Sequence, residues 1–259
     1  AVDMGHALNE KQFELYYQPK IDIKTNTIIS AEALGRWKHP TKGFIPPDIF
    51  IDALEQYNSI DKYTYNAIDE AIENIKQWIS TGNNIKVAIN ISTQTLMNPD
   101  FINQIENKIT DFSISKRIIF EITESLFLSN QEFVFDSLTR LRSLGIELSI
   151  DDFGTGYSSL SYLQKFQLDE LKIDRSFIKD ISRNSNDASI TRAIILMAHS
   201  LGLEIIAEGI ETEAQKEFIR EHGCRYAQGY LYSRPVPADE ISKMLVERQS
   251  ARIYCESGE

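Results

Sequence analysis

Two adjacent carboxylates end an apolar run in the middle of the chain. The run from Ile146 to Ile150 is followed directly by Asp151 and Asp152, and then by the glycine-containing stretch 153–159. Neighbouring acids repel each other where the dielectric constant is low, so each needs a counter-charge to stay ionised, and a shared divalent cation supplies one. A plainer alternative is that one aspartate caps the next helix. The pair alone leaves both interpretations open.

Similar polar residues end or interrupt other apolar runs along the chain. Polar groups inside strands cost free energy unless they are paired, so these interruptions call for a common explanation. Taken singly, each could be a strand-end cap, a turn residue or, for the lysine, an ion-pair partner. With the two aspartates, the set is Glu32, Asn90, Glu121, Asp151, Asp152, Lys172 and Glu208.

The order of strand-like and helix-like runs predicts how these residues are positioned. Strands are predicted over 13–17, 27–34, 86–91, 117–122, 146–150, 170–173, 204–207 and 226–230. Helices are predicted from residue 46, over 64–79, 101–109, 133–144 and 187–201, from 212 to 223, and from 237. About eight alternating units fit a (β/α)8-type barrel better than an open sheet. The carboxyl ends of barrel strands meet at one rim, which would bring the polar residues together.

Two local patterns refine this expectation. The turn-like Lys24-Thr25-Asn26 is short enough to join the first two strands as a hairpin, which would depart from the all-parallel rule at that point. Thr212 and Gln215 have the spacing of a capping box, which predicts the start of a helix.

Together, the seven residues form a candidate site for hard cations. Five carboxylates and an amide oxygen suit one or two Mg²⁺ or Mn²⁺ ions and do not suit zinc, which prefers nitrogen and sulfur ligands. A pair of such ions activates water and neutralises developing charge, as phosphoester hydrolysis requires. Lys172 could orient or deprotonate that water, or bind phosphate.

Composition narrows the class of protein. The chain has 259 residues, of which 42% are apolar, enough for one large domain or two small ones. No apolar run approaches the ~20 residues that span a bilayer. The net charge of −11 argues against a broad DNA- or RNA-binding surface. The two cysteines and four histidines lack the spacing of a zinc site or a disulfide framework. We predict a soluble chain cut from a longer protein.

Several motifs resemble the EAL-domain family, the cyclic di-GMP phosphodiesterases. The tripeptide Glu32-Ala33-Leu34 matches the signature of that family, although a lone tripeptide would carry no weight. Further matches occur in the family's order and cover roughly Leu8 to Val246. They lie at 16–19, 90–92, 121–125, 151–159, 171–174, 207–211 and 228–230.

The resemblance implies a fold, a reaction and a set of metal ligands. The fold would be a modified TIM (β/α)8 barrel with one antiparallel strand, and the reaction would convert cyclic di-GMP to linear pGpG with Mg²⁺ or Mn²⁺. The implied ligands of one ion are Glu32, Asn90, Glu121 and Asp151. Asp151 would bridge to a second ion that Asp152 also serves, and Glu208 would complete the site directly or through water.

The resemblance also implies the remaining site residues. Lys172 would hold the attacking water and could act as its general base, with Glu32 and Glu208 beside it in the catalytic set. The implied substrate contacts are Gln18, Leu34, Arg36, Glu211 and Gln228. Glu124 and the stretch 153–159 resemble an anchor and a mobile loop that couple metal binding to dimerisation.

Partners and boundaries follow from the same resemblance. A homodimer is expected, as is a sensor or diguanylate-cyclase-like domain upstream in the full-length chain. The domain itself is expected to lie in the cytoplasm. We predict a linker remnant over 1–10, the EAL domain over 11–246, and a polar, disordered tail over 247–259. The chain departs from the family at Gly35 and at 52–55, positions with no assigned role.

Two alternatives are left open by the sequence. The first is a catalytically silent receptor that binds cyclic di-GMP and passes the signal to a partner. Such family members typically carry substitutions among the metal ligands or in the loop after the paired acids, whereas this chain has the catalytic residue types. The second is an enolase-like barrel in which Mg²⁺ and a lysine remove a proton from a carboxylate substrate. The matches at Gln18 and Gln228 count against it.

Overall fold

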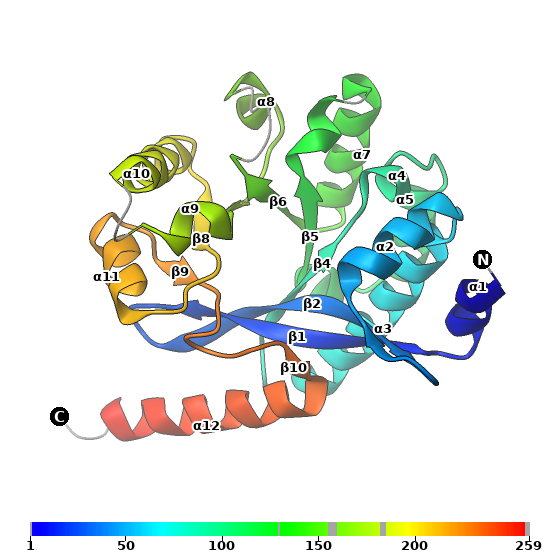
Figure 1. Ribbon diagram of the computed structural model, residues 1–259, viewed down its shortest axis with the longest axis horizontal. Coiled ribbons are helices and arrows are strands. Elements are labelled where there is room, and N and C mark those ends of the chain that lie inside the picture. The colour runs from blue at the N-terminus through cyan, green and yellow to red at the C-terminus, as the bar shows by residue number, and fades with distance from the viewer. Residues whose placement is uncertain (1, 129, 155–159, 182–184, 257–259) are drawn as a thin grey trace.

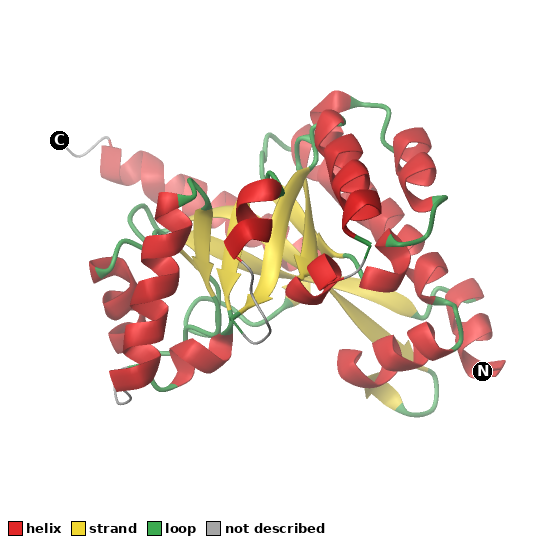
Figure 2. Cartoon of the chain, turned by 90° about the horizontal axis from the view of Figure 1, so that it is seen from above, coloured by secondary structure: helices red, strands yellow, loops and turns green. Residues whose placement is uncertain are grey.

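The computed structural model describes residues 2–128, 130–154, 160–181 and 185–256, with the backbone alone for 2, 3, 128, 160–162 and 248–256. Within these residues, eight strands close into a barrel with helices outside it (Figure 1, Figure 2). The barrel strands are β1 (Phe13–Asp22), β2 (Thr27–His39), β4 (Lys86–Asn90), β5 (Ile118–Thr123), β6 (Glu147–Phe153), β7 (Glu170–Ile173), β8 (Glu204–Ala207) and β9 (Tyr226–Ala227). Two short strands extend the sheet, β3 (Gly43–Ile45) and β10 (Val236–Pro237).

Helices follow most of the strands and form the outer layer. The longer ones are α2 (Pro47–Gln56), α3 (Ile60–Ser80), α5 (Phe101–Lys108), α7 (Gln131–Ser143), α10 (Ser185–Ser200), α11 (Glu213–Glu221) and α12 (Ala238–Glu256). The others are α1 (Val2–Asn9), α4 (Thr93–Leu96), α6 (Phe112–Ser115), α8 (Leu160–Lys165), α9 (Arg175–Lys179) and the 3₁₀-helix η1 (Glu124–Leu128).

The barrel closes through an antiparallel hairpin. Strand β1 pairs antiparallel with both β2 and β9, while the pairs from β2 and β4 through β8 and β9 are parallel. In the described part of the chain, β1 is thus the one antiparallel barrel strand, which confirms the predicted modified (β/α)8 barrel. The hairpin register sets Gln18 opposite Glu32 and so places a predicted substrate contact beside a predicted metal ligand.

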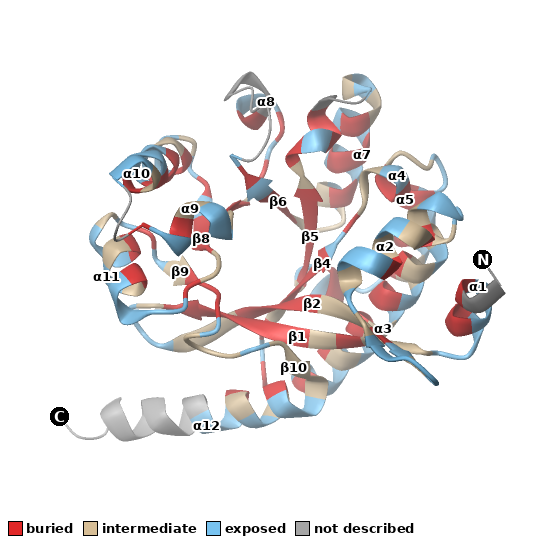
Figure 3. Ribbon diagram, viewed as in Figure 1, coloured by how far each residue is buried: buried red, intermediate tan, exposed pale blue. Residues whose placement is uncertain are grey.

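The core lies between the barrel strands and the inner faces of the helices. Figure 3 shows buried residues concentrated on the strands and on one side of helices such as α3. Ile68, Ile72 and Ile75 recur at helical spacing and bury the inner face of α3. At the end of this helix, Trp78 is buried and its indole Nε1 donates a hydrogen bond to Ser242 Oγ at 2.8 Å. This bond joins α12 to α3.

Several strands differ in length from the prediction. β1 continues to Asp22 and β6 to Phe153. β2 continues to His39 and pairs with β3, which the sequence pattern did not indicate. The last strand is shorter than predicted, because β9 ends at Ala227. Gly229 then packs so tightly that a Cβ there would lie 2.2 Å from the Ile210 carbonyl oxygen. The chain therefore turns against the Ile210 backbone instead of continuing the ladder.

The described residues near both ends of the chain form helices. The stretch predicted as a linker remnant forms α1, which buries Ala7 and Leu8 in a small apolar cluster with Trp37 and Phe50. The stretch predicted as a disordered tail continues α12 through Glu256. A helix of eight residues is marginal by itself in water, so α1 forms because its apolar face packs against these partners.

Candidate active site

The ammonium group of Lys172 lies among four carboxylates at the carboxyl ends of the barrel strands. Its Nζ is 2.7 Å from Glu208 Oε1, 3.0 Å from Glu121 Oε2, 3.0 Å from Asp151 Oδ1 and 3.4 Å from Glu32 Oε2. The Lys172 side chain is only 1% exposed. These residues come from β2, β5, β6, β7 and the segment that follows β8, so the predicted convergence on one rim is confirmed.

Two amides extend the cluster on the side of Glu32. Asn90 Nδ2 donates to Glu32 Oε1 at 2.9 Å, and Gln228 Nε2 donates to Glu32 Oε2 at 2.6 Å. Gln228 Nε2 also lies 3.0 Å from Gln18 Oε1. Both oxygens of Glu32 are therefore held by amide donors, and two predicted substrate contacts lie directly beside a predicted metal ligand.

The backbone of Asp152 lets two adjacent carboxylates face the same site. Successive side chains of a regular strand point to opposite faces, so Asp151 and Asp152 would normally diverge. Asp152 instead has φ of 52°, in the left-handed region, and the β6–β7 register shifts between Ile150 and Phe153. Non-glycine residues adopt this conformation rarely, and it concentrates at functional sites.

The carboxylates are close enough to share a metal ion. Three carboxylate oxygens lie within 4.8 Å of one another, one each from Glu32, Glu121 and Asp151. The same holds for one oxygen each from Asp151, Asp152 and Glu208. Asp151 belongs to both groups. The donors are hard oxygen ligands of the kind that Mg²⁺ and Mn²⁺ prefer, so the residues fit the predicted class of metal.

The electrostatics of the cluster point to a surplus of negative charge. Burial, followed by repulsion from Glu32, raises the pKa of Glu121 to about 8 although two lysines oppose the shift. Burial likewise raises the pKa of Glu208 to about 7. Burial would lower the pKa of Lys172, but the surrounding carboxylates outweigh it and raise that pKa well above its usual value. Two ammonium groups, those of Lys172 and Lys20, are too little positive charge for this many acids, and a divalent cation would supply the remainder.

Two further members of the cluster, Lys20 and Glu170, were absent from the predicted site. Lys20 Nζ is 2.9 Å from Glu121 Oε1 and 2.7 Å from Glu170 Oε1, inside the barrel. The signal that could have found them is the period of two along a strand. Lys20 follows Gln18 by two residues and Glu170 precedes Lys172 by two, so each shares a strand face with a predicted site residue.

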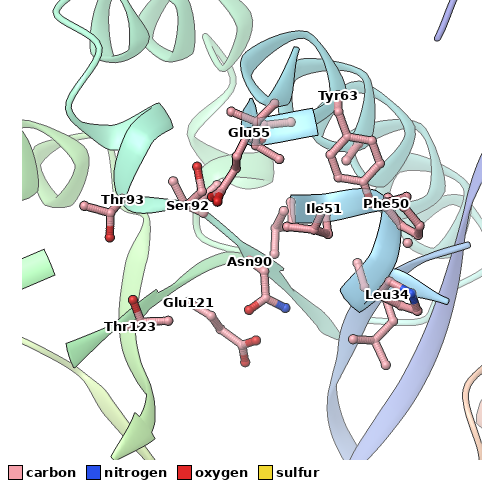
Figure 4. Close-up of a pocket in the computed structure, with 18 of the residues that line it drawn as sticks. Leu34, Phe50, Ile51, Glu55, Tyr63, Asn90, Ser92, Thr93, Glu121 and Thr123 are labelled. Carbon is pink, nitrogen blue, oxygen red and sulfur yellow. The ribbon is translucent and has the colours of Figure 1, made fainter. Parts of the chain in front are cut away.

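A cleft of about 720 Å³ adjoins the cluster (Figure 4). Asn90 and Glu121 are neighbours across the β4–β5 ladder and line the cleft together with Asp152. Its apolar side includes Leu34, Phe50, Ile51 and Tyr63. The acidic end of the cleft could bind phosphate groups through cations, and its apolar side could hold flat rings. The cleft therefore fits a ligand that carries both groups.

The departure from the family at Gly35 has a structural reason in this cleft. A Cβ at residue 35 would lie 1.8 Å from the Tyr63 hydroxyl oxygen and 3.0 Å from Tyr63 Cζ. The Tyr63 hydroxyl thus takes the space that a side chain at residue 35 would fill. A side chain at residue 35 would therefore require the Tyr63 side chain to move or to lose its hydroxyl.

Gly35→Ala is therefore expected to lower the free energy of unfolding by about 1–3 kcal/mol, the usual cost of overpacking. The double variant Gly35→Ala/Tyr63→Phe should recover at least half of that loss, because it removes the clashing hydroxyl. Urea unfolding measures both. Gly5→Ala is the control, since a Cβ at Gly5 meets nothing within 4 Å. Equal losses in the single and double variants would contradict the assigned clash.

The remaining predicted substrate contacts lie at the same end of the barrel. Arg36 Nη1 donates to the Gly35 carbonyl oxygen at 2.9 Å, and the guanidinium lies over the Tyr16 ring. Glu211 is exposed, and its backbone N–H donates to Gln215 Oε1 at 2.8 Å. Gln215 also forms the predicted capping box with Thr212, which is confirmed. The box fixes the segment that carries Glu211.

Glu124 begins η1 and is 8% exposed. Neither of its carboxylate oxygens accepts a hydrogen bond from the described residues. The loop that it is predicted to anchor includes residues 155–159, which lie outside the described residues. The anchoring role therefore stays a prediction.

Comparisons with known proteins identify the family. Residues 1–235 match the family model described as EAL domain. The chain is 38% identical over 241 residues to the bifunctional diguanylate cyclase/cyclic di-GMP phosphodiesterase MucR of Pseudomonas aeruginosa, covering 92% of this chain and 35% of MucR. It is 34% identical over 236 residues to the cyclic di-GMP phosphodiesterase RocR of the same organism, covering 91% of this chain and 60% of RocR.

Solved structures agree with this relationship. A structure described as the PaMucR phosphodiesterase in complex with c-di-GMP has a TM-score of 0.88 at 38% identity, covering 93% of this chain and 98% of that one. The EAL enzyme Bd1971, in its form with cAMP and cyclic di-GMP bound, has a TM-score of 0.87 at 33% identity, covering 93% of this chain and 67% of that one. Together with the barrel and its acidic rim, these matches show that the chain belongs to the EAL domain family.

Proposed function

We propose that the chain is a metal-dependent phosphodiesterase that hydrolyses one phosphodiester bond of cyclic di-GMP to give linear pGpG. The observation that carries the proposal is the arrangement of two sets of three carboxylates. The two sets share Asp151, which contacts the ammonium of Lys172. The names of MucR and RocR support it, because both relatives are called cyclic di-GMP phosphodiesterases. Membership of the EAL domain family also argues against the enolase-like alternative.

The proposed cofactor is Mg²⁺ or Mn²⁺, with one or two ions per site. Glu32, Asn90, Glu121 and Asp151 would hold one ion, and Asp151, Asp152 and Glu208 would hold a second. When bound, such ions supply activation of water and neutralisation of charge on the phosphoryl oxygens. The chain contributes a converging set of oxygen donors that share Asp151.

Lys172 would hold the reacting groups beside the metal ligands. In the arrangement described here its pKa is raised well above the usual value, so the side chain stays a charged donor. Lys172 could act as a general base only after it loses its proton. That loss requires another cation to replace the ammonium as the counter-ion of the neighbouring carboxylates. We therefore propose that its first role is electrostatic, namely to orient water and phosphate oxygens.

Gln18, Leu34, Arg36, Glu211 and Gln228 are the proposed substrate contacts. Leu34 lines the cleft, and Gln18 and Gln228 lie in contact with each other beside Glu32. Arg36 is the proposed ligand of a phosphate group. Guanidinium suits this role because its planar donors match phosphate oxygens.

Replacing Arg36 by Met is expected to raise the KM for cyclic di-GMP by about 10- to 100-fold, the worth of a hydrogen bond to a charged group. The kcat should change by less than about threefold if Arg36 binds ground state and transition state alike. Steady-state kinetics at saturating Mn²⁺ separates the two constants. Lys38→Met is the control, because Lys38 is exposed two residues further along the same strand. A KM equal to that of the control would contradict phosphate binding by Arg36.

The proposed reaction is tested by chromatography of cyclic di-GMP incubated with the chain in Mg²⁺, Mn²⁺ or EDTA. We expect pGpG to form with either metal and not with EDTA. Binding of cyclic di-GMP without pGpG would contradict the hydrolase and favour the catalytically silent receptor. Absence of both binding and hydrolysis would contradict both functions.

We also propose a wider context for the chain. The chain spans about a third of MucR, whose name includes a diguanylate cyclase, so a cyclase-like or sensor domain upstream and a homodimer are proposed partners. A cytoplasmic location is proposed because cyclic di-GMP would be met there. Among the helices that the structure describes, none has the length and apolar character needed to cross a bilayer. The domain boundaries at residues 11 and 246 also stay proposals.

A further inference from the structure

A second set of polar side chains lies deeper in the barrel, beneath the metal-site carboxylates. Interior positions recur every two residues along a strand, so Ser149 lies below Asp151 and Glu170 below Lys172. Lys20 enters from the antiparallel strand β1, where its register partner is Ser30. Lys20 and Ser149 have no exposed surface, and Glu170 is 8% exposed.

These side chains hold the Glu121 carboxylate from below. Lys20 Nζ contacts Glu121 Oε1 at 2.9 Å, while Lys172 Nζ contacts Glu121 Oε2 at 3.0 Å. Lys20 is itself fixed by Glu170 Oε1 at 2.7 Å, and Ser149 Oγ donates to the same oxygen at 2.9 Å. The chain of contacts thus runs from Ser149 and Glu170 through Lys20 to a proposed metal ligand.

We propose that Lys20 is a positioning residue that fixes the orientation of Glu121 for metal binding, with Glu170 and Ser149 as its support. This inference rests on the proposed function, because it assigns Glu121 to the metal site. Partners outside the ligand set orient ligands, and their loss typically costs about 10- to 100-fold in metal affinity or activity. A buried lysine that donates to two acceptors has little rotational freedom. The carboxylate oxygen that it contacts is restricted in the same way.

The competing explanation is that Lys20 only neutralises Glu170. The single variant Lys20→Met does not separate the two explanations, because it removes a positive charge next to the metal site and so also strengthens attraction for a cation. A double variant that removes Lys20 and the charge of Glu170 leaves the net charge unchanged. If neutralisation is the whole role of Lys20, this double variant binds metal like the wild type.

The test is a Mn²⁺ titration followed by electron paramagnetic resonance of the free ion. The variants are Lys20→Met/Glu170→Gln and Lys20→Met/Glu170→Leu. The second is expected to fold even if the first does not, since apolar residues often replace a buried ion pair without loss of stability. The control is Lys86→Met/Glu147→Gln, which removes an ion pair of 2.5 Å between Nζ and Oε1 at the partly exposed amino ends of β4 and β6.

We expect both Lys20 doubles to bind Mn²⁺ about 10-fold or more weakly than the wild type, and the control double to bind within about twofold. At saturating Mn²⁺, kcat for cyclic di-GMP should fall while KM stays within about twofold, since Lys20 does not line the cleft. Wild-type Mn²⁺ affinity in the Lys20 doubles would overturn this inference alone. Absence of Mn²⁺ binding by the wild-type chain would overturn the inference and the proposed metal-dependent reaction together.

Discussion

Lys172→Met is expected to make the stability of the chain depend on a divalent cation. Without metal, the variant should lose about 3–5 kcal/mol of unfolding free energy, because removal of one partner leaves buried charges uncompensated. The loss should be large here since Lys172 contacts four carboxylates and is 1% exposed. Mn²⁺ should restore most of it, because the ion can neutralise the same carboxylates.

Urea unfolding in EDTA and in Mn²⁺ measures this effect. The matched control is Lys86→Met, the same substitution at a lysine whose side chain is 41% exposed and paired with Glu147. A surface pair of that kind contributes less than about 1 kcal/mol, so the control should lose little and respond to Mn²⁺ as the wild type does. Equal losses in Lys172→Met and the control would show that Lys172 is not the counter-ion of the cluster. Hydrolysis should fall at least about 100-fold in Lys172→Met even with Mn²⁺, the scale of a positioned catalytic group.

Asp151→Asn is expected to have the largest effect on hydrolysis. Asp151 belongs to both carboxylate groups that could hold a metal, whereas Glu32 and Glu208 each belong to one. The substitution preserves size and removes the charge and one strong oxygen donor. We expect pGpG formation to fall by about 1,000-fold or more, comparable to loss of a principal electrostatic contact in other enzymes.

Asp69→Asn provides the control for this prediction. Asp69 lies on α3 and pairs with Lys108 at an exposed position, so the same chemical change there should leave hydrolysis and Mn²⁺ binding unchanged. Chromatography gives the rate, and Mn²⁺ titration should show weaker binding or fewer bound ions in Asp151→Asn. If Asp151→Asn kept more than a tenth of the wild-type rate with normal Mn²⁺ binding, Asp151 would not be a shared metal ligand.

The strength of both predictions comes from burial. Glu121 and Lys172 are almost completely inaccessible to water, so their charges are weakly screened. An exposed cluster of the same residues would tolerate single substitutions with small losses. The same burial raises the pKa values of Glu121 and Glu208.

The sequence by itself determined the barrel and the composition of its rim. Period-two runs separated by helical segments predict parallel strands with crossovers, and the carboxyl ends of such strands meet at one edge. Glu32, Glu121 and Lys172 could therefore be placed together from their positions at strand ends alone. The antiparallel hairpin was likewise readable from the short turn at 24–26.

Only the tertiary structure decided which of these side chains touch, and which others join them. The left-handed backbone of Asp152 turns a second carboxylate toward the site. Lys20 reaches Glu121 across 101 residues of chain and Glu170 across 150. Such contacts depend on strand register, on barrel closure and on how deep each side chain reaches. Local sequence periodicity carries none of that information, because it specifies which face a residue occupies and not which residue lies opposite.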